Sequence, residues 1–323
     1  MRSEFQRVGE LINAAEDIAL ISHERPDGDA VGSLLAMSVS LQLSGKRAVP
    51  VLADGVPGRF RFLPTWQTVQ NRLPEAWDLL ICVDAGDLRR MGLDPGVFVR
   101  PPDINIDHHP TNSNYARVNI VDPAAAASAE LIHDLILALG LPMDLDVATC
   151  LLAGLVNDTI GFRTTNVTPR VLRMAADLLE QGAPLARIYE LSLSQRSFDA
   201  ARYWGSGLSS LERDGGLIWA SLSLEDRLRA GYPGPDDADL VDLLTTIEGA
   251  EIVVIMVEQL GGKTKVSWRC KAGLDVSSLA ARFGGGGHRP AAGAVIEGSL
   301  DDVKARVLEA TRQLLHNPME AKA

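Results

Sequence analysis

The feature that most constrains this chain is an alternation, through its N-terminal half, of short apolar runs with longer segments of helical periodicity. The apolar runs predict strands at residues 18–22, 48–52, 79–83 and 104–106. The longer segments predict helices at residues 30–43, 124–139, 145–155 and 169–181. Strands that alternate with helices form βαβ units with parallel strands. We therefore expect an α/β fold, with an N-terminal, mostly parallel sheet and helices on both of its faces.

The periodicity changes in the C-terminal part of the chain. Strands are predicted at 217–222, 251–259, 263–269 and near 294–296, and helices at 240–246 and 276–283. Gly261-Gly262, between two of these strands, favours a tight hairpin turn. The 323 residues also suit two domains. We expect a first domain at 1–184, a connecting helix at 185–205 and a smaller α+β domain at 206–323.

Composition narrows the class of protein. Hydrophobic residues make up 46% of the chain, which is typical of a globular protein and excludes disorder. The three cysteines are widely spaced, and the N-terminus does not resemble a signal peptide. No apolar run approaches the roughly 18 residues that span a membrane. These features favour a protein of the cytoplasm without membrane contact. The net charge, 31 − 42 = −11, argues against a protein that coats duplex nucleic acid.

Acids and histidines cluster where the predicted elements end. The first strand is followed by His23, Asp27 and Asp29, the third by Asp84, the fourth by Asp107, His108 and His109, and the helix at 145–155 by Asp158. Parallel strands bring their carboxyl ends to one edge of a sheet, where ligands bind. This donor set suits Mn²⁺, Mg²⁺ or Zn²⁺. So many carboxylates would repel one another around a single ion, and two divalent ions would offset this repulsion. A pair of divalent ions is also the usual device for phosphoester hydrolysis.

Each of these residues has a structural alternative when it is considered alone. A lone Asp after a strand is more often a helix cap or a turn residue, and Asp29 is a candidate cap. We interpret Asp87 and Asp122 as turn residues, and His133 and His316 as packing or surface residues. Four clusters at the same level of one sheet favour a shared site over four separate structural roles.

In these residues the chain resembles the DHH phosphoesterase family. Asp107-His108-His109 is similar to the motif that names the family, and the segment from His23 to Asp29 is similar to its first motif. Asp84 and Asp158 resemble the second and fourth motifs, and the GGGGH run with the following small residues at 284–293 resembles the DHHA1 domain. Among family members, a chain of this size is most similar to the nanoRNase group, which also acts on 3′-phosphoadenosine 5′-phosphate (pAp).

The resemblance implies two Mn²⁺ ions, with Mg²⁺ or Co²⁺ as substitutes. It implies that one ion is held by His23, Asp27 and Asp84, and the other by Asp29, Asp84, His108 and Asp158. His109 would face the scissile phosphate as an acid or electrostatic donor, and Asp107 would orient a histidine. One position departs from the pattern: many relatives have glycine directly after the Asp-Thr of the fourth motif, where this chain has Ile160 before Gly161.

Basic charge in the second domain gathers near the glycine run. Residues 263–290 hold six Lys or Arg and one Asp, a net charge of +5. Glycines expose backbone N–H groups to anions, and a flexible loop is their structural alternative. Together with the resemblance, this predicts that a terminal phosphate of the substrate is bound by Arg269, Gly285, Gly286, Gly287 and His288, with Arg163 as a further contact.

The expected function is hydrolysis of short single-stranded RNA to mononucleotides and removal of the 3′-phosphate of pAp, in a cleft between the two domains. Two alternatives stay open: hydrolysis of cyclic di-AMP or its linear product pApA, and a non-catalytic nucleotide-binding regulatory module. We expect small nucleotides, and no duplex nucleic acid, as partners. Family resemblance alone suggests a homodimer.

Overall fold

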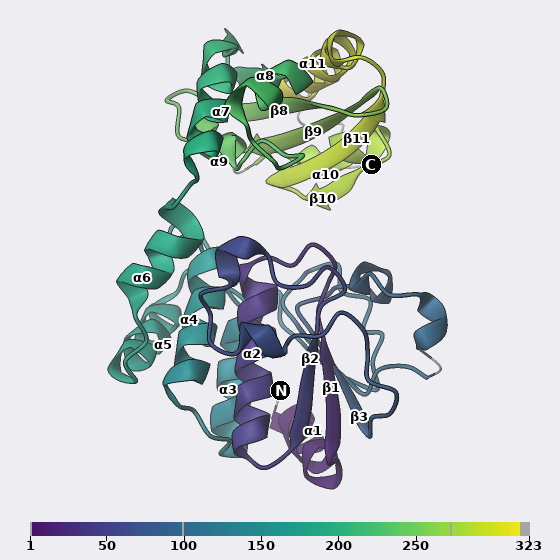
Figure 1. The fold of residues 1–323 in the computed structure, drawn as a ribbon, viewed down its shortest axis with the longest axis vertical. Helices are drawn as coiled ribbons and strands as arrows, with labels where there is room; N and C mark the ends of the chain where they lie inside the picture. The colour runs from purple at the N-terminus through teal and green to yellow at the C-terminus, as the bar shows by residue number, and fades with distance from the viewer. Residues whose placement is uncertain (1, 99, 272, 317–323) are drawn as a thin grey trace. The chain divides into compact units, whose positions relative to one another are not determined.

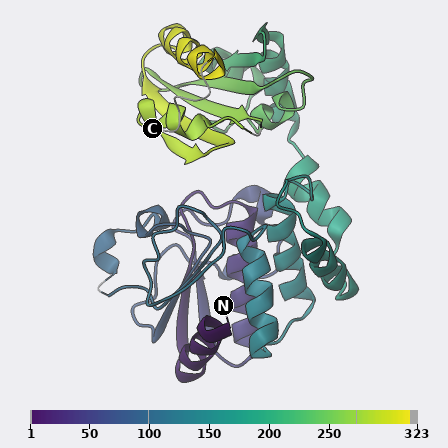
Figure 2. The ribbon, with the colours of Figure 1, turned by 180° about the vertical axis from the view of Figure 1, so that it is seen from behind.

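The computed structural model describes residues 2–98, 100–271 and 273–316. The chain divides into two compact units between Gln195 and Arg196, and we describe each unit by itself. The division falls inside the segment 185–205, which the sequence predicts to be one connecting helix. Figures 1 and 2 show the fold of both units from opposite sides.

The predicted connecting helix is wrong in detail, because the segment contains two helices. α6 (Leu185–Tyr189) continues into a π-helical turn, η5 (Glu190–Ser194), and α7 (Phe198–Ser209) begins after a break. Gln195 is extended at the break, with ψ 131°. Ser197 then caps α7, since its side chain accepts a hydrogen bond from the N–H of Ala200.

Unit 1 contains a five-stranded sheet in which all neighbouring strands are parallel, which confirms the predicted class. The strands are β1 (Asp17–Ile21), β2 (Arg47–Val51), β3 (Leu79–Val83), β4 (Ile104–Asp107) and β5 (Val118–Val121). Their order is β2-β1-β3-β4-β5. The sequence does not predict β5, because only four residues pair there and Asn119 interrupts the apolar run.

The two faces of this sheet are covered differently. Long helices lie over one face or pack on the helices that do: α1 (Arg2–Ala14), α2 (Gly28–Leu43), α3 (Ser128–Leu139), α4 (Leu145–Asp158) and α5 (Pro169–Glu180). On the other face, Ile21, Leu80 and Cys82 pack under loop residues and single 3₁₀ turns such as η3 (Leu88–Met91). Helices therefore lie on both faces, but those of the second face are only 3₁₀ turns.

Crossover handedness accounts for this division of the helices. The chain moves from β1 to β2 in one direction across the sheet, and then in the opposite direction to β3, β4 and β5. Right-handed crossovers therefore place α2 on one face and the later connections on the other. The strand order also reverses between β1 and β3, and ligands of such sheets bind outside the carboxyl ends of the strands at that point. His23 follows β1 there, and Asp84 follows β3.

Unit 2 is built on a six-stranded mixed sheet of order β10-β11-β9-β8-β7-β6, in agreement with the predicted α+β class. Its strands are β6 (Glu212–Asp214), β7 (Leu217–Leu222), β8 (Ile252–Gln259), β9 (Lys263–Cys270), β10 (Gly286–His288) and β11 (Ala291–Glu297). Only β7 and β8 pair in parallel. Gly261 and Gly262 have φ values of +79° and +70° in the β8–β9 turn, so the predicted hairpin is confirmed.

Helices cover both faces of the second sheet. α10 (Val276–Arg282) and α11 (Leu300–His316) pack on the face that contains Trp219 and Trp268. α7, α8 (Leu224–Ala230) and α9 (Leu240–Leu244) pack on the face that contains Ile218 and Ile255. The sequence does not predict α8 or α11.

The described part of the chain contains no helix that is both long enough and apolar enough to cross a membrane. The three cysteines are unpaired: Cys82 and Cys150 are buried, and Cys270 is partly buried. They are also far from thiolate form, because burial raises the pKa of each thiol. None of the three joins the metal-ligand groups described below.

Gly32 marks the closest approach of α2 to α4. A Cβ at Gly32 would lie 2.4 Å from the backbone oxygen of Cys150. We expect Gly32→Ala to lower the free energy of unfolding by about 1–3 kcal/mol, as overpacking of a tight core does. Gly58 is the matched control in the same unit, because a Cβ there would have nothing within 4 Å and its φ is not left-handed. Urea denaturation followed by circular dichroism compares the two, and equal losses would contradict this packing account.

Candidate metal centre

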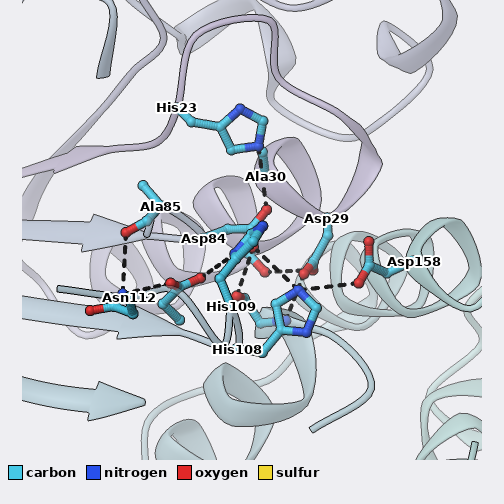
Figure 3. Close-up of polar contacts among 12 residues, drawn as sticks. His23, Asp29, Ala30, Asp84, Ala85, His108, His109, Asn112 and Asp158 are labelled. Carbon is cyan, nitrogen blue, oxygen red and sulfur yellow. Dashed lines mark hydrogen bonds and ion pairs between the residues drawn. The ribbon is translucent and has the colours of Figure 1, made fainter. Parts of the chain in front are cut away.

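Asp84 lies at the middle of a cluster of acids and histidines at the carboxyl edge of the first sheet (Figure 3). Its side chain is 2% exposed. Oδ2 lies 3.6 Å from Nε2 of His23, and Oδ1 lies 3.8 Å from Nε2 of His108. The residue has a left-handed backbone, with φ +53°, directly after β3. The two oxygens of one buried carboxylate therefore face two different histidines.

The first ligand group consists of His23, Asp27 and Asp84, whose ligand atoms all lie within 4.8 Å of one another. Asp27 is the N-cap of α2: its Oδ1 accepts the N–H groups of Asp29 and Ala30. Its Oδ2 lies 3.9 Å from Nε2 of His23. The cap of α2 is thus Asp27 and not Asp29, and the same carboxylate serves both the helix and the candidate site.

The second ligand group consists of Asp29, His108 and Asp158, again within 4.8 Å. Oδ2 of Asp158, at the end of α4, lies 3.2 Å from Nε2 of His108. Asp29 also accepts hydrogen bonds from the N–H groups of Ser128 and Ala129, at 2.6 and 3.0 Å. These N–H groups open α3, whose own N-cap residue provides no side-chain hydrogen bond. Asp29 therefore ties the start of α3 to the centre.

The rings of the histidines are oriented through Nδ1. Nδ1 of His23 lies 2.7 Å from the backbone oxygen of Glu24, and Nδ1 of His108 lies 3.3 Å from that of Ala125. Because a carbonyl oxygen only accepts, each Nδ1 carries the proton in these contacts. Nε2 of both rings then faces the carboxylates of the cluster.

His109 is positioned by a buried carboxylate. Its Nδ1 lies 2.7 Å from Oδ1 of Asp107, whose side chain is fully buried. The other oxygen of Asp107 accepts a hydrogen bond from the amide of Asn112. Nδ1 of His109 also lies 3.6 Å from Oδ1 of Asp84, so Asp84, His108 and His109 form a third group of candidate ligands. The sequence does not point to Asn112, because a loop asparagine five residues after Asp107 carries no signal of its own.

Crowding shifts the pKa values of these groups. Burial, and then the charge of Asp84, raises the pKa of Asp29 to about 7. Burial and the charge of Asp29 raise the pKa of Asp158 well above its ordinary range. Burial opposes ionisation of Asp84, but the adjacent imidazoles, His23 foremost, outweigh it and lower its pKa. Burial also opposes protonation of His108, but Asp158 and Asp84 outweigh it and raise the pKa of His108 to about 9.

The donor set fits divalent cations. Carboxylate oxygens and imidazole nitrogens converge there without a thiolate, which suits Mg²⁺, Mn²⁺ or Zn²⁺. Burial and neighbouring carboxylates together raise the pKa values of Asp29 and Asp158, and a bound cation would offset this negative charge. Asp84 belongs to the first ligand group, and its Oδ1 lies 3.8 Å from Nε2 of His108 in the second, so this carboxylate would be placed to serve two cations.

The residues predicted to bind substrate belong to both units, and we describe them unit by unit. In unit 2, Nε of Arg269 lies 3.2 Å from Oδ1 of Asp242. The N–H groups of Gly284 and Gly285 donate to backbone oxygens at the end of α10, and Gly286–His288 pair with β11. Packing accounts for glycine at 285 and 287, where a Cβ would lie 2.1 and 2.6 Å from backbone oxygens of β11. The side chain of His288 lies outside the described residues.

Arg163 lies exposed in the loop after α4, in unit 1. Its backbone N–H donates to the oxygen of Thr159, at 2.8 Å. Its predicted contact with a phosphate stays a prediction, as do the substrate roles of Arg269, His288 and the glycines.

The fold and the site define a class, which is that of hydrolases acting on phosphoester bonds. The chain belongs to the DHH family: the model of the DHH family, N-terminal domain, matches residues 17–155, and that of the DHHA1 domain matches residues 227–317. The predicted family is thereby confirmed.

Similar proteins agree with this assignment. The chain is 39% identical over 315 residues to the "Bifunctional oligoribonuclease and PAP phosphatase NrnA" of Thermus thermophilus, covering 95% of this chain and 93% of that protein. It is 27% identical to the protein of the same name from Bacillus subtilis, with coverages of 92% and 93%. An exopolyphosphatase-related protein from Bacteroides fragilis shares the fold, with a TM-score of 0.92, 24% identity and 98% coverage of both chains.

Divalent cations should stabilise the protein through this cluster. We expect Mn²⁺ to raise the melting temperature and EDTA to reverse the gain, because a cation offsets the repulsion of the buried carboxylates. Histidines with a pKa near 9 must lose protons to bind it, so the gain should be larger at about pH 8.5 than at about pH 6.5. Calorimetric melting curves measure both effects.

Asp158→Asn tests whether the gain comes from this site. The substitution removes one of the crowded charges, so we expect the metal-free variant to melt no lower than the wild type at about pH 8.5, while most of the Mn²⁺-dependent gain is lost. Asp122→Asn is the matched control, because Asp122 lies in a turn, where its side chain accepts the N–H of Ala124, and it belongs to none of the ligand groups found among the described residues. An undiminished gain in Asp158→Asn would contradict the second ligand group.

Proposed function

We propose that the protein is a Mn²⁺-dependent phosphoesterase that hydrolyses short RNA oligonucleotides to mononucleotides and removes the 3′-phosphate of pAp. The observation that carries this proposal is the position of Asp84, which belongs to the first ligand group and lies 3.8 Å from Nε2 of His108 in the second. The names of relatives that cover nearly the whole chain support the substrate class. The activities in these names, oligoribonuclease and PAP phosphatase, support short oligonucleotides and small nucleotides as the substrates.

The candidate ligands fall into two sets, one for each divalent ion. His23, Asp27 and Asp84 would hold one divalent ion, and Asp29, Asp84, His108 and Asp158 the second. When bound, such a pair supplies an activated water and a clamp on the phosphoryl oxygens. The carbonyl oxygens of Glu24 and Ala125 keep the Nδ1 atoms of His23 and His108 protonated, so that each ring offers Nε2 as a ligand.

His109 is proposed to act on the scissile phosphate. Asp107 fixes the orientation of its ring through Nδ1, while Asn112 holds the second oxygen of Asp107 in place. A histidine held in this way can stabilise charge in the transition state or pass a proton to the departing oxygen. Asp107 is thus a positioning residue, which acts through His109.

The substrate's own phosphate is proposed to bind unit 2. Arg269, His288, Gly285, Gly286 and Gly287 would recognise it. Arg163, in unit 1, is proposed separately as a residue that contacts the substrate. The local charge of +5 over residues 263–290 supports a phosphate there. Arg269 already contacts Asp242, so a substrate phosphate would compete with this carboxylate for the guanidinium.

His109→Ala should lower kcat by about 10²–10⁴-fold, because it removes a group that acts in the transition state. Bound metal, measured by mass spectrometry of the desalted Mn²⁺-loaded protein, should stay within about twofold of the wild type. Asp107→Asn should lower kcat in the same direction by weakening the orientation of His109. A parallel loss of metal in His109→Ala would assign His109 to the ligands instead.

Arg269→Ala should raise KM for pAp by about tenfold or more, since a charged hydrogen bond to phosphate is lost. KM for bis(p-nitrophenyl) phosphate, which has no terminal phosphate, should change much less. Arg282→Ala is the matched control, because Arg282 is an exposed arginine of the same unit. Equal effects of Arg269→Ala on both substrates would contradict the phosphate contact.

A panel of kcat/KM values tests the proposed function itself. It compares pAp, pApA, cyclic di-AMP and RNA of two to about ten nucleotides, with Mn²⁺ and with EDTA. Preference for short RNA and pAp supports the proposal. Preference for cyclic di-AMP would reassign the substrate, and no turnover with any divalent metal would indicate a nucleotide-binding module.

A further inference from the structure

The loop after Asp158 has an unusual backbone. Ile160, Gly161 and Phe162 are consecutive left-handed residues, with φ values of +48°, +68° and +65°. Left-handed φ is ordinary for glycine but a genuine outlier for a β-branched residue such as Ile160. Strain of this kind persists only where surrounding contacts impose it, and it concentrates at functional sites.

Local contacts hold this loop in place. The hydroxyl of the buried Thr159 accepts the N–H of Phe162 at 2.9 Å, and the N–H of Gly161 donates to the oxygen of Val156 at 2.7 Å. The ring of Tyr189, the last residue of α6, lies against Gly161: a Cβ there would fall 2.3 Å from Cε2 of the ring. The left-handed conformation of the loop therefore depends both on hydrogen bonds within the loop and on packing against Tyr189 of α6.

The strained loop presents apolar surface beside the metal centre. Ile160 is 50% exposed, and Tyr189 is 39% exposed. Ile160 follows Asp158 by two residues, so their Cα atoms are at most about 7.6 Å apart. Tyr189 precedes the π-helical turn η5, a type of distortion that is frequent at functional sites. Both residues belong to unit 1 and so keep their relation to the centre.

We infer that Ile160 and Tyr189 form the surface that binds the nucleobase next to the scissile phosphate. The inference rests on the proposed function, which places a nucleotide phosphate at the metal centre. The base is the apolar part of a nucleotide, and an aromatic ring with an aliphatic neighbour is the surface on which bases stack. The strain at Ile160 is then the cost of displaying an aliphatic side chain at a position where glycine would be relaxed.

The test compares AMP with ribose 5-phosphate, which has the same phosphate but lacks the base. Titration calorimetry on the Mn²⁺-loaded protein gives both dissociation constants. The wild type should bind AMP at least about tenfold more tightly, and Tyr189→Ala should reduce that preference by about tenfold. Tyr189→Phe should retain most of it, because the ring stays. Leu172→Ala is the matched control, since Leu172 is a 50% exposed residue of α5 in the same unit.

Ile160→Gly separates a functional from a structural role. It should raise the melting temperature by relieving the left-handed strain, and it should also reduce the preference for AMP about threefold or more. A purely structural Ile160 would give the first effect without the second.

These measurements do not depend on turnover. An unchanged AMP preference in both Tyr189→Ala and Ile160→Gly overturns the inference, even where the enzyme hydrolyses pAp as proposed. Loss of the preference in both variants supports the inference, and the substrate panel decides separately whether pAp and short RNA are hydrolysed. Absence of any AMP preference in the wild type also overturns it.

Discussion

Electrostatic crowding around Asp84 is the constraint on which the rest of the first unit depends. Buried carboxylates repel one another, and a fold that brings Asp29, Asp84 and Asp158 together must hold them against that repulsion. The parallel sheet does so by geometry, because its strands end at one edge. The helices do so through hydrogen bonds, because their N-terminal N–H groups favour negative charge. Asp27 accepts hydrogen bonds from N–H groups at the start of α2, and Asp29 accepts them from N–H groups at the start of α3.

The same carboxylates accept hydrogen bonds from helix N-termini and belong to the ligand groups. The contacts that stabilise the fold therefore also position the candidate ligands. Asp29 accepts hydrogen bonds from α3 and from the hydroxyl of Ser33, and it also belongs to a ligand group. The glycines obey the same constraint: a Cβ at Gly154 would lie 2.7 Å from Oδ1 of Asp29, so α4 can approach the carboxylate only without a side chain there. Ligands held in this way are preorganised, because a cation that binds does not have to order them.

The sequence predicts which acids and histidines lie together better than it predicts the boundaries of the elements. The clusters at His23, Asp84 and Asp107 were recognisable because each follows a short apolar strand, and parallel strands end together. β5 escaped prediction because a four-residue strand interrupted by an asparagine lacks a clear period. The break after Ser194 was missed because a π-helical turn preserves helical composition while it ends the α-helix. Asn112 was missed because its role is set by its tertiary contact with Asp107 and not by any pattern.

Backbone strain, like the electrostatic crowding, is concentrated near the candidate ligands. Five of the described non-glycine residues with left-handed φ lie in loops that carry or adjoin the candidate ligands: Arg25, Asp84, Asn114, Ile160 and Phe162. Aspartate tolerates that region, but isoleucine and phenylalanine do so at a cost of order 1–3 kcal/mol each. The apolar core beneath them, in which α2 is buried on nearly all sides, is large enough to offset such a cost. A loosely packed support would let the loops relax, and the carboxylates would then move apart. The close packing of α2 against α4 is therefore a condition for the site, since it holds both the charges and the strained loops in place.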